Sequence, residues 1–271
     1  MADQSKNNSA QRQHVPSGDA PVDALATHVL SMIAKKNAES AAQLDLDIAE
    51  RLRDVAAEPT VNTVPELISK MLKAGISPDT IATVYIPHAA RQMGEDWCDD
   101  NLSFARVTIG TARLQSSLRT LGTDWTSQGY PDERHADGGA IVIIAKDPYH
   151  TLGAMVLCGQ LRRMGLSVRL AMGVSTQELR KLFFDTSFDA ALISASASES
   201  LESLREYVDV IRQSSAVCPP IIVGGNVLDQ DEDVKAATGA DLTTRDPMEA
   251  LEHCGIPRSS YKETLQQERR T

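Results

Sequence analysis

The sequence predicts an α/β protein with an N-terminal all-α helical bundle followed by a doubly wound, five-stranded parallel sheet. Three observations support this prediction. Apolar residues recur at three- and four-residue steps over 21–122, short continuous apolar runs appear after residue 139, and helical segments separate those runs. A polar stretch rich in turn-forming residues, 123–139, lies between the two patterns and predicts a linker.

The first half has the periodicity of helices throughout. In "VDALATHVLSMIAKK" the apolar residues that fall on one helix face are Val22, Leu25, Val29 and Ile33. Further helical runs follow at 40–56, 64–74, 78–95 and 103–121. Gly75 is a typical helix stop. Because strand-like alternation is absent, we expect a small helical bundle.

The second half alternates strands with helices. The runs typical of strands buried on both faces are "AIVIIA" (140–145), "SVRLAM" (167–172), "DAALIS" (189–194), "PIIVGG" (220–225) and, more weakly, "GADLT" (239–243). The helical segments lie near 152–164, 176–184, 199–214, 230–237 and 246–253. The second of these begins with "STQE" (175–178), a capping-box pattern. This alternation predicts a flavodoxin-like domain over 140–254, although the strand order stays open.

Composition limits the classes of function. The formal net charge of −10 argues against a large nucleic-acid footprint, and no stretch approaches the ~20 apolar residues of a membrane span. Residues 1–20 lack the apolar segment of a secretory signal and predict a disordered tail, and 255–271 predict a polar C-terminal tail. The cysteines lie far apart, without the spacing of a zinc site. We expect a cytoplasmic protein that does not contact membranes.

Residues at the carboxyl ends of the strands are the candidate site, because parallel α/β sheets bind ligands there. "KDPYHTLG" follows the first strand, "GVST" the second, "SASAS" the third and "GGN" the fourth. Glycine-rich dinucleotide and phosphate motifs are absent. A phosphoryl-accepting receiver domain needs a carboxylate where Ser194 stands, and Tyr149 is the only aromatic residue in these loops, whereas flavin sites usually have several.

His150 therefore faces a set of small residues at the other strand ends. Imidazole is a good ligand for a borderline metal ion, and a nearby carboxylate such as Asp147 can fix its tautomer. Small residues leave room for a long group at the sheet edge, so the combination suits a metal macrocycle with a bulky tail. A solvated histidine and purely structural serines and glycines stay open as alternatives.

These residues resemble the cobalamin-binding domains of methionine synthase and related corrinoid proteins. Their pattern is Asp-x-His-x-x-Gly after the first strand, Ser-x-Leu after the third and Gly-Gly after the fourth. The matching segments here are His150-Thr151-Leu152-Gly153, Ser194-Ala195-Ser196 and Gly224-Gly225. The resemblance implies that His150 coordinates cobalt from below. It also implies a slot for the nucleotide tail lined by Ser194, Ser196, Gly224 and Gly225.

Two positions depart from that pattern. Asp147 lies three residues before His150 rather than two, within the segment Asp147-Pro148-Tyr149-His150, so the usual Asp–His bond is in doubt. Ser196 stands where the pattern has leucine.

The helical half resembles the cap that covers the upper face of cobalamin in these proteins. Related caps carry a tryptophan followed ten and eleven residues later by Glu-His. Trp97 is present here, but Val107 and Thr108 replace the pair. Since Glu-His characterises light-sensing adenosylcobalamin regulators, the resemblance implies a hydroxo or aquo form of cobalamin rather than adenosyl. Trp97, Thr108 and His88 are the candidates for the upper face.

The domain order, the shifted Asp-Pro-Tyr-His and the missing Glu-His together resemble the AerR/PpaA antirepressors of purple photosynthetic bacteria. This resemblance implies a cobalamin-binding, light-responsive regulator, not an enzyme, that restrains a CrtJ/PpsR-type repressor of photosystem genes. The protein would then reach DNA only indirectly, through this partner. A corrinoid carrier subunit of a methyltransferase system is the alternative, and a flavodoxin-like module with another ligand is a third.

Overall fold

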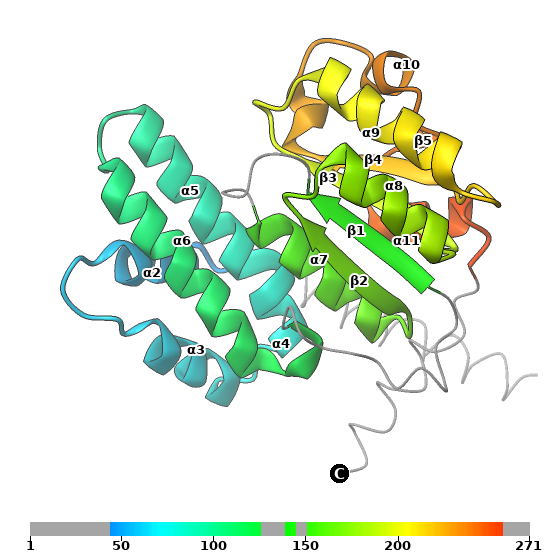
Figure 1. Ribbon diagram of the computed structural model, residues 1–271. Coiled ribbons are helices and arrows are strands. Elements are labelled where there is room, and N and C mark those ends of the chain that lie inside the picture. Colours follow the sequence, from blue (N-terminus) through cyan, green and yellow to red (C-terminus); the bar gives the residue numbers. More distant parts are fainter. Residues whose placement is uncertain (1–43, 126–138, 145–150, 257–271) are drawn as a thin grey trace, which may run out of the picture. The chain divides into compact units, whose positions relative to one another are not determined.

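The computed structural model describes residues 44–125, 139–144 and 151–256 (Figure 1). Its helical region comprises α2 (Leu46–Ala57), α3 (Val64–Lys73), α4 (Pro78–Thr80), the π-helical turn η1 (Ile81–Tyr85), α5 (Ile86–Cys98), α6 (Phe104–Leu118) and the 3₁₀ turns η2 (Arg119–Leu121) and η3 (Thr123–Trp125). The predicted helices at 64–74, 78–95 and 103–121 match these elements. The one predicted at 40–56 begins at Leu46, because Asp45 caps it there, and 40–43 lie outside the described residues. The predicted helix near residue 22, the predicted N-terminal tail and most of the predicted linker lie outside the described residues. So does the predicted C-terminal tail beyond residue 256, whereas Ile256 itself is buried in the core of the sheet.

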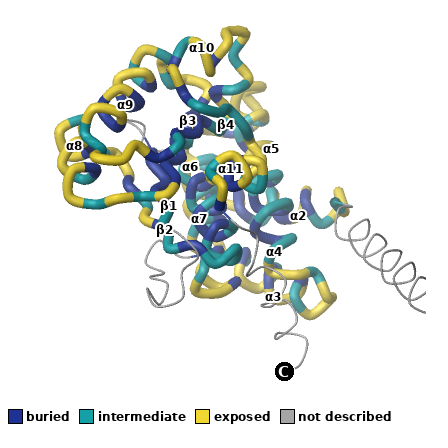
Figure 2. Tube along the Cα trace, turned by 90° about the vertical axis from the view of Figure 1, so that its right-hand side faces the viewer, coloured by how far each residue is buried: buried dark blue, intermediate teal, exposed yellow. Residues whose placement is uncertain are grey.

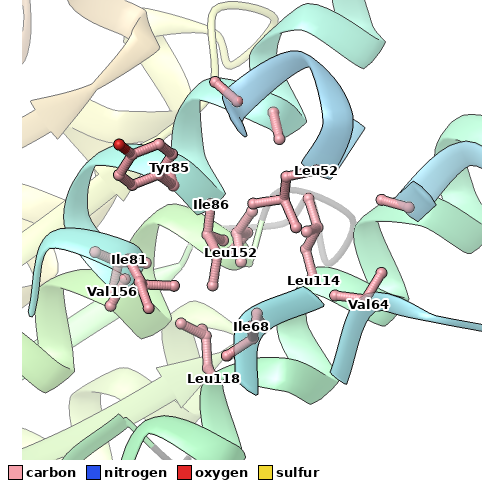
Figure 3. Close-up of a cluster of buried hydrophobic side chains, with 14 of the residues drawn as sticks. Leu52, Val64, Ile68, Ile81, Tyr85, Ile86, Leu114, Leu118, Leu152 and Val156 are labelled. Atoms are coloured by element: carbon pink, nitrogen blue, oxygen red, sulfur yellow. The ribbon is translucent and has the colours of Figure 1, made fainter. Parts of the chain in front are cut away.

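Helix starts in this region follow from local capping. Asp45 accepts hydrogen bonds from the first amides of α2, and the Ser103 hydroxyl accepts one from the Arg106 amide at the start of α6. The core behind these helices is aliphatic, with Leu52, Ile86 and Leu114 fully buried (Figure 3). Leu152 and Val156, which belong to the first helix of the α/β region, lie in the same core.

The α/β region is a five-stranded parallel sheet, as predicted. Its strands are β1 (Gly139–Ile144), β2 (Ser167–Met172), β3 (Ala190–Ala195), β4 (Ile221–Gly225) and β5 (Leu242–Thr243). The strand order is β2-β1-β3-β4-β5, which is the flavodoxin-like order and resolves what the sequence left open.

Helices cover both faces of the sheet. They are α7 (Leu152–Arg163), α8 (Thr176–Asp185), α9 (Leu201–Ser214), α10 (Val234–Thr238) and α11 (Pro247–His253). Alternate strand residues pack against α8, α9 and α10 on one face and against α7 and α11 on the other. Figure 2 shows β1, β3 and β4 as the buried centre. Among the described helices, none combines the length and the apolarity that crossing a bilayer would take.

Side-chain caps set where two of these helices begin. Ser175 and Glu178 form the predicted capping box at the start of α8, with the Ser175 amide donating to the Glu178 carboxylate at 2.8 Å. The helix predicted at 230–237 begins later, at Val234, because the Asp233 side chain accepts from the Ala236 amide and caps it there.

The start of the predicted linker, 123–139, forms the turn η3 and differs from a solvated linker. Trp125 is almost fully buried, and its ring lies against Gly159 of α7. The Asp124 carbonyl accepts a hydrogen bond from Arg162 at 3.1 Å. These residues therefore join the core of the helical region to α7.

Asp241, directly before β5, ties two other elements together. One carboxylate oxygen accepts the Ile221 amide of β4 at 2.7 Å, and the other accepts Arg212 of α9 at 2.8 Å. Burial by itself would raise the pKa of this carboxyl, but the hydrogen bonds from Arg212 and Ile221 outweigh it and lower the pKa.

We expect Asp241→Asn to lower the free energy of unfolding by about 1–2 kcal/mol at neutral pH. Because the pKa is depressed in the folded state, the stabilisation is complete above the unfolded pKa of about 3.9 and is lost as pH falls through the folded pKa. Urea unfolding of both proteins at about pH 7 and about pH 3 should therefore show the difference narrowing in acid. A difference that stays constant across this range would contradict the assignment.

Candidate functional site

The strand pairing places several predicted site residues side by side. Ser194 of β3 pairs with Ile144 of β1 on one side and with Gly224 of β4 on the other. These three residues also share the sheet face covered by α7 and α11, because alternate residues point the same way. The boundary between β1 and β3 is the switch point of this strand order, where ligands bind.

The three predicted residues of the loop after β1 lie outside the described residues. They are Asp147, Tyr149 and His150, and the predicted lower ligand therefore stays a prediction. Its neighbours on either side are described. β1 ends at Ile144, and α7 begins at Leu152 with Thr151 as its N-terminal flanking residue.

The three predicted residues at the start of α7 have different surroundings. Thr151 makes no cap bond to its own helix, and its hydroxyl instead accepts a hydrogen bond from Gln115 of α6. Leu152 is buried in the core of the helical region. Gly153 is exposed, and a Cβ added there would meet no atom within 4 Å. Within the described protein, only Gly153 of the three faces open space.

The two predicted serines at the end of β3 also differ from each other. Ser194 is half-buried, at the centre of the aligned positions. Ser196 is buried, and its hydroxyl lies 2.9 Å from the Ser198 hydroxyl. The loop that holds them is fixed by Gln230, whose side-chain amide donates to the carbonyl of Ala197 at 2.8 Å.

The glycine pair is closed in by the protein's own backbone. A Cβ on Gly224 would lie 2.5 Å from the Thr244 carbonyl oxygen, and a Cβ on Gly225 would lie 2.4 Å from that of Ala195. Gly225 also has φ 96° and ψ −166°, a region that is essentially restricted to glycine. The close approach of β3 and of the chain after β5 therefore accounts for both glycines without a ligand.

Two aromatic rings are exposed on the helical region where α5 ends and α6 begins. Trp97 is 47% exposed and Phe104 is 63% exposed, with ring centroids 5.8 Å apart. Thr108 lies one turn along α6 from Phe104 and donates its hydroxyl to the Phe104 carbonyl at 2.9 Å. Phe104 contacts both predicted residues, because its ring lies beside that of Trp97 and its carbonyl accepts the Thr108 hydroxyl. The sequence analysis did not select Phe104, although aromatic residues are uncommon in this chain.

His88 does not share the side of α5 on which Trp97 lies. At about 3.6 residues per turn, their separation of nine positions makes about two and a half turns and places them on opposite sides of the helix. The His88 Nε2 atom is buried, with no hydrogen-bond partner among the described residues. Predicting both for one ligand face was therefore wrong for this pair.

Three further features of the described residues bear on binding chemistry. A hollow of about 430 Å³ on the helical region is lined in part by Arg53 and Asp96, which form an ion pair at 2.9 Å. Burial raises the pKa of the Cys158 thiol to about 12 and that of Cys254 to about 11, so both thiols are protonated at neutral pH. Where the structure describes the chain, no three acidic, histidine or cysteine side chains gather as a metal site.

Comparison with known proteins assigns the α/β region. Residues 138–252 match the model of the B12 binding domain, which defines the chain as a protein with a B12-binding domain. Its fold resembles that of the Methanosarcina barkeri monomethylamine corrinoid protein, with a TM-score of 0.62 and 17% identity over 77% of this chain and 97% of that one.

A sequence relative narrows the assignment. Over 182 residues the chain is 36% identical to an uncharacterized 20.5 kDa protein of Rhodobacter capsulatus from the bchF-crtJ intergenic region. The match covers 66% of this chain and 93% of the relative. The chain belongs to the same family as that protein. The resemblance to cobalamin-binding domains drawn from the strand ends is confirmed.

Proposed function

We propose that this protein binds cobalamin and acts as a light-responsive antirepressor of the AerR/PpaA type, by binding a CrtJ/PpsR-type repressor. The observation that carries the proposal is its similarity, across 93% of the relative, to a protein from the bchF-crtJ intergenic region. The name of that region contains the name of a repressor in the proposed partner class.

Three features of the described residues fit a corrinoid. Gly153 leaves space among the described residues beside the start of α7, Ser194 is half-buried at the switch point, and the tilted Trp97–Phe104 pair exposes apolar ring surface. His150 would hold cobalt from below, and Ser194 and Ser196 would line the path of the nucleotide tail. When bound, the cofactor supplies a cobalt centre whose axial ligands can change on illumination.

The upper face would be covered by Trp97 and Phe104, with Thr108 as the nearest hydroxyl. Because Val107 and Thr108 stand where the adenosylcobalamin regulators that the cap resembles have Glu-His, the hydroxo or aquo form is proposed over adenosyl. The protein's own response would be a shift between arrangements of the helical region and α7. Such a shift changes the surface that a repressor meets.

The test compares His150→Ala with His253→Ala, since His253 is an exposed histidine at the end of α11. Wild type and His253→Ala should bind hydroxocobalamin and absorb visible light alike. Their affinity for a CrtJ/PpsR-type repressor should differ between dark and illuminated samples. His150→Ala should bind cobalamin at least about ten-fold more weakly and lose the light response.

Other outcomes would exclude parts of this proposal. A wild-type protein that stays colourless after purification from cobalamin-supplemented cells excludes cobalamin binding. A His150→Ala protein with an unchanged spectrum excludes this histidine as the ligand. Methyl transfer to the bound corrinoid from a methyl-donor protein, without any light-dependent partner binding, would support the carrier alternative instead.

A further inference from the structure

The loops after β2, β3, β4 and β5 lie at the carboxyl ends of the strands, where parallel sheets bind ligands, and their described residues are mostly acidic or neutral. Among these residues the one cation is Arg245, in the loop after β5. The acidic side chains in the same loops are Glu199, Asp229, Asp231, Glu232, Asp233 and Asp246. Within this part of the sheet edge, an anionic group of a ligand is therefore attracted to the position beside Arg245.

The Arg245 side chain reaches from the end of β5 back to the end of β4, its neighbour in the sheet (Figure 1). Its Nε donates to the Gly225 carbonyl at 3.4 Å, and its Nη2 donates to the Asp229 carboxylate at 2.5 Å. Gly225 pairs in turn with Ala195 of β3, the strand that carries Ser194. The guanidinium therefore lies at the same edge of the sheet as the predicted site residues of β3 and β4.

The guanidinium of Arg245 has donors left for a further ligand. Its side chain is 51% exposed and that of Asp229 is 62% exposed, so the ion pair is open to solvent. An arginine has five N–H groups, and only two of them are used by the bonds to Gly225 and Asp229 among the described residues. Such a planar fork suits a phosphate group, since it can donate two parallel hydrogen bonds to a pair of phosphate oxygens.

We propose that Arg245 binds the phosphodiester in the nucleotide tail of cobalamin and thereby selects corrinoids that have a complete tail. The inference rests on the proposed cobalamin binding. The side chains of the corrin ring end in neutral amides, whereas the phosphodiester of the tail carries a negative charge. Asp229 acts against this contact, because its carboxylate shares the guanidinium and repels the phosphodiester.

Three substitutions change this cation or its partner. Arg245→Met removes the charge from a long side chain, and Arg245→Lys keeps the charge but loses the planar fork. Asp229→Asn removes the competing charge, while its side-chain oxygen can still accept from Arg245. Arg205→Met is the matched control, because Arg205 of α9 is also exposed and also bonds one carbonyl, of Ala237, and one carboxylate, of Asp209.

The experiment measures the dissociation constants of hydroxocobalamin and of cobinamide, a corrinoid without the phosphodiester, ribose and base. Arg245→Met should bind hydroxocobalamin about three- to ten-fold more weakly and cobinamide as wild type does. Arg245→Lys should fall between the two, and Asp229→Asn should bind hydroxocobalamin more tightly, by up to about three-fold. Arg205→Met should bind both corrinoids like wild type.

Salt provides a second readout that needs hydroxocobalamin alone. Because a charged contact near the surface is screened, raising the salt concentration from about 50 mM to about 500 mM should weaken hydroxocobalamin binding more in wild type than in Arg245→Met. An equal salt dependence in the two proteins would overturn the inference, since the lost contact would then carry no charge.

The remaining outcomes separate the inference from the function beneath it. If wild type binds hydroxocobalamin and Arg245→Met binds it equally well, the inference is overturned and cobalamin binding stands. Equal losses for hydroxocobalamin and cobinamide in Arg245→Met also overturn it, because the effect then does not depend on the tail. Weaker hydroxocobalamin binding by Asp229→Asn contradicts the proposed position of the phosphodiester. A wild-type protein that binds neither corrinoid removes the proposed function, and the inference with it.

Discussion

Replacing Trp125 with alanine is expected to lower the free energy of unfolding by about 3–5 kcal/mol. The indole is 1% exposed, and its six-membered ring lies where a side chain at Gly159 would be, 2.1 Å from an added Cβ. Truncation leaves a cavity between η3 and the middle of α7, which a helix held on both sides cannot close. Urea unfolding of the cobalamin-free protein measures the loss.

The chain provides its own control, because its other tryptophan is exposed. Trp97→Ala loses a tilted ring contact with Phe104 and should lower stability by less than about 1 kcal/mol. The order of the two variants should reverse for cobalamin affinity. At equal folded concentration, Trp97→Ala should bind more weakly than Trp125→Ala, because we propose that Trp97 covers the upper face of the cofactor. Equal stability losses in the two variants would contradict the placement of Trp125.

Trp125 also shows what pattern reading misses. A three-residue turn is too short for a hydrophobic period, and the polar residues after it predict a linker. A signal was nevertheless present in the partner helix. Gly159 interrupts the helical pattern of α7, and a glycine within a helix often has a packing reason. Its partner lies more than thirty residues earlier in the chain, so the pair emerges only from the tertiary structure.

The elements themselves were predictable because their signals are local. β1, β3 and β4 are largely apolar runs, and α8 begins at a capping box within four residues. The prediction that 167–172 is buried on both faces was wrong, because β2 lies at the edge of the sheet and Arg169 within it is exposed. The strand order cannot be predicted from local signals, because it depends on the side of β1 on which each strand–helix–strand connection places the next strand. The two-residue strand β5 was correspondingly the weakest prediction, because it has few apolar residues and pairs with β4 alone.

The alignment of candidate residues at the strand ends was predictable from the sequence, whereas contacts between helices were not. β3 and β4 are parallel neighbours, and their register pairs Ser194 with Gly224. Because both residues lie near the carboxyl ends of their strands, the sequence was enough to predict that they lie side by side. Phe104 and Gln115 were missed because their roles depend on how α6 lies against α5 and α7. The pairing of His88 with Trp97 was wrong because the helical period between them was not applied.

Gly225→Ala is expected to lower the free energy of unfolding by at least about 2 kcal/mol. The backbone at Gly225 is in a conformation that alanine rarely adopts, and the new methyl group would press on the Ala195 carbonyl of the neighbouring strand. The backbone of residue 225 fixes the position of the new methyl carbon, and the carbonyl that it meets is itself backbone. The collision therefore cannot be relieved by rotating a side chain. Unfolding in urea, without cobalamin, measures the loss.

Gly153→Ala is the matched variant with the opposite expectation. The glycine lies in the first turn of α7, and an added methyl group there meets no atom of the described residues within 4 Å. Stability should therefore stay the same or rise by up to about 1 kcal/mol, since alanine favours the helix. Cobalamin affinity should nevertheless fall, because the open space beside the start of α7 is where we propose that the cofactor lies.

Comparing the two glycine variants distinguishes a loss of cobalamin binding caused by a damaged fold from a loss caused by contact with the cofactor. Loss of cobalamin binding in Gly225→Ala alone would follow from the damaged sheet edge and would say nothing about contact with the cofactor. Loss of binding in Gly153→Ala, in a protein at least as stable as wild type, has no such origin. If Gly153→Ala binds cobalamin with wild-type affinity, the cofactor does not occupy the space beside this residue, and the carry-over of the His-x-x-Gly pattern to Gly153 is wrong.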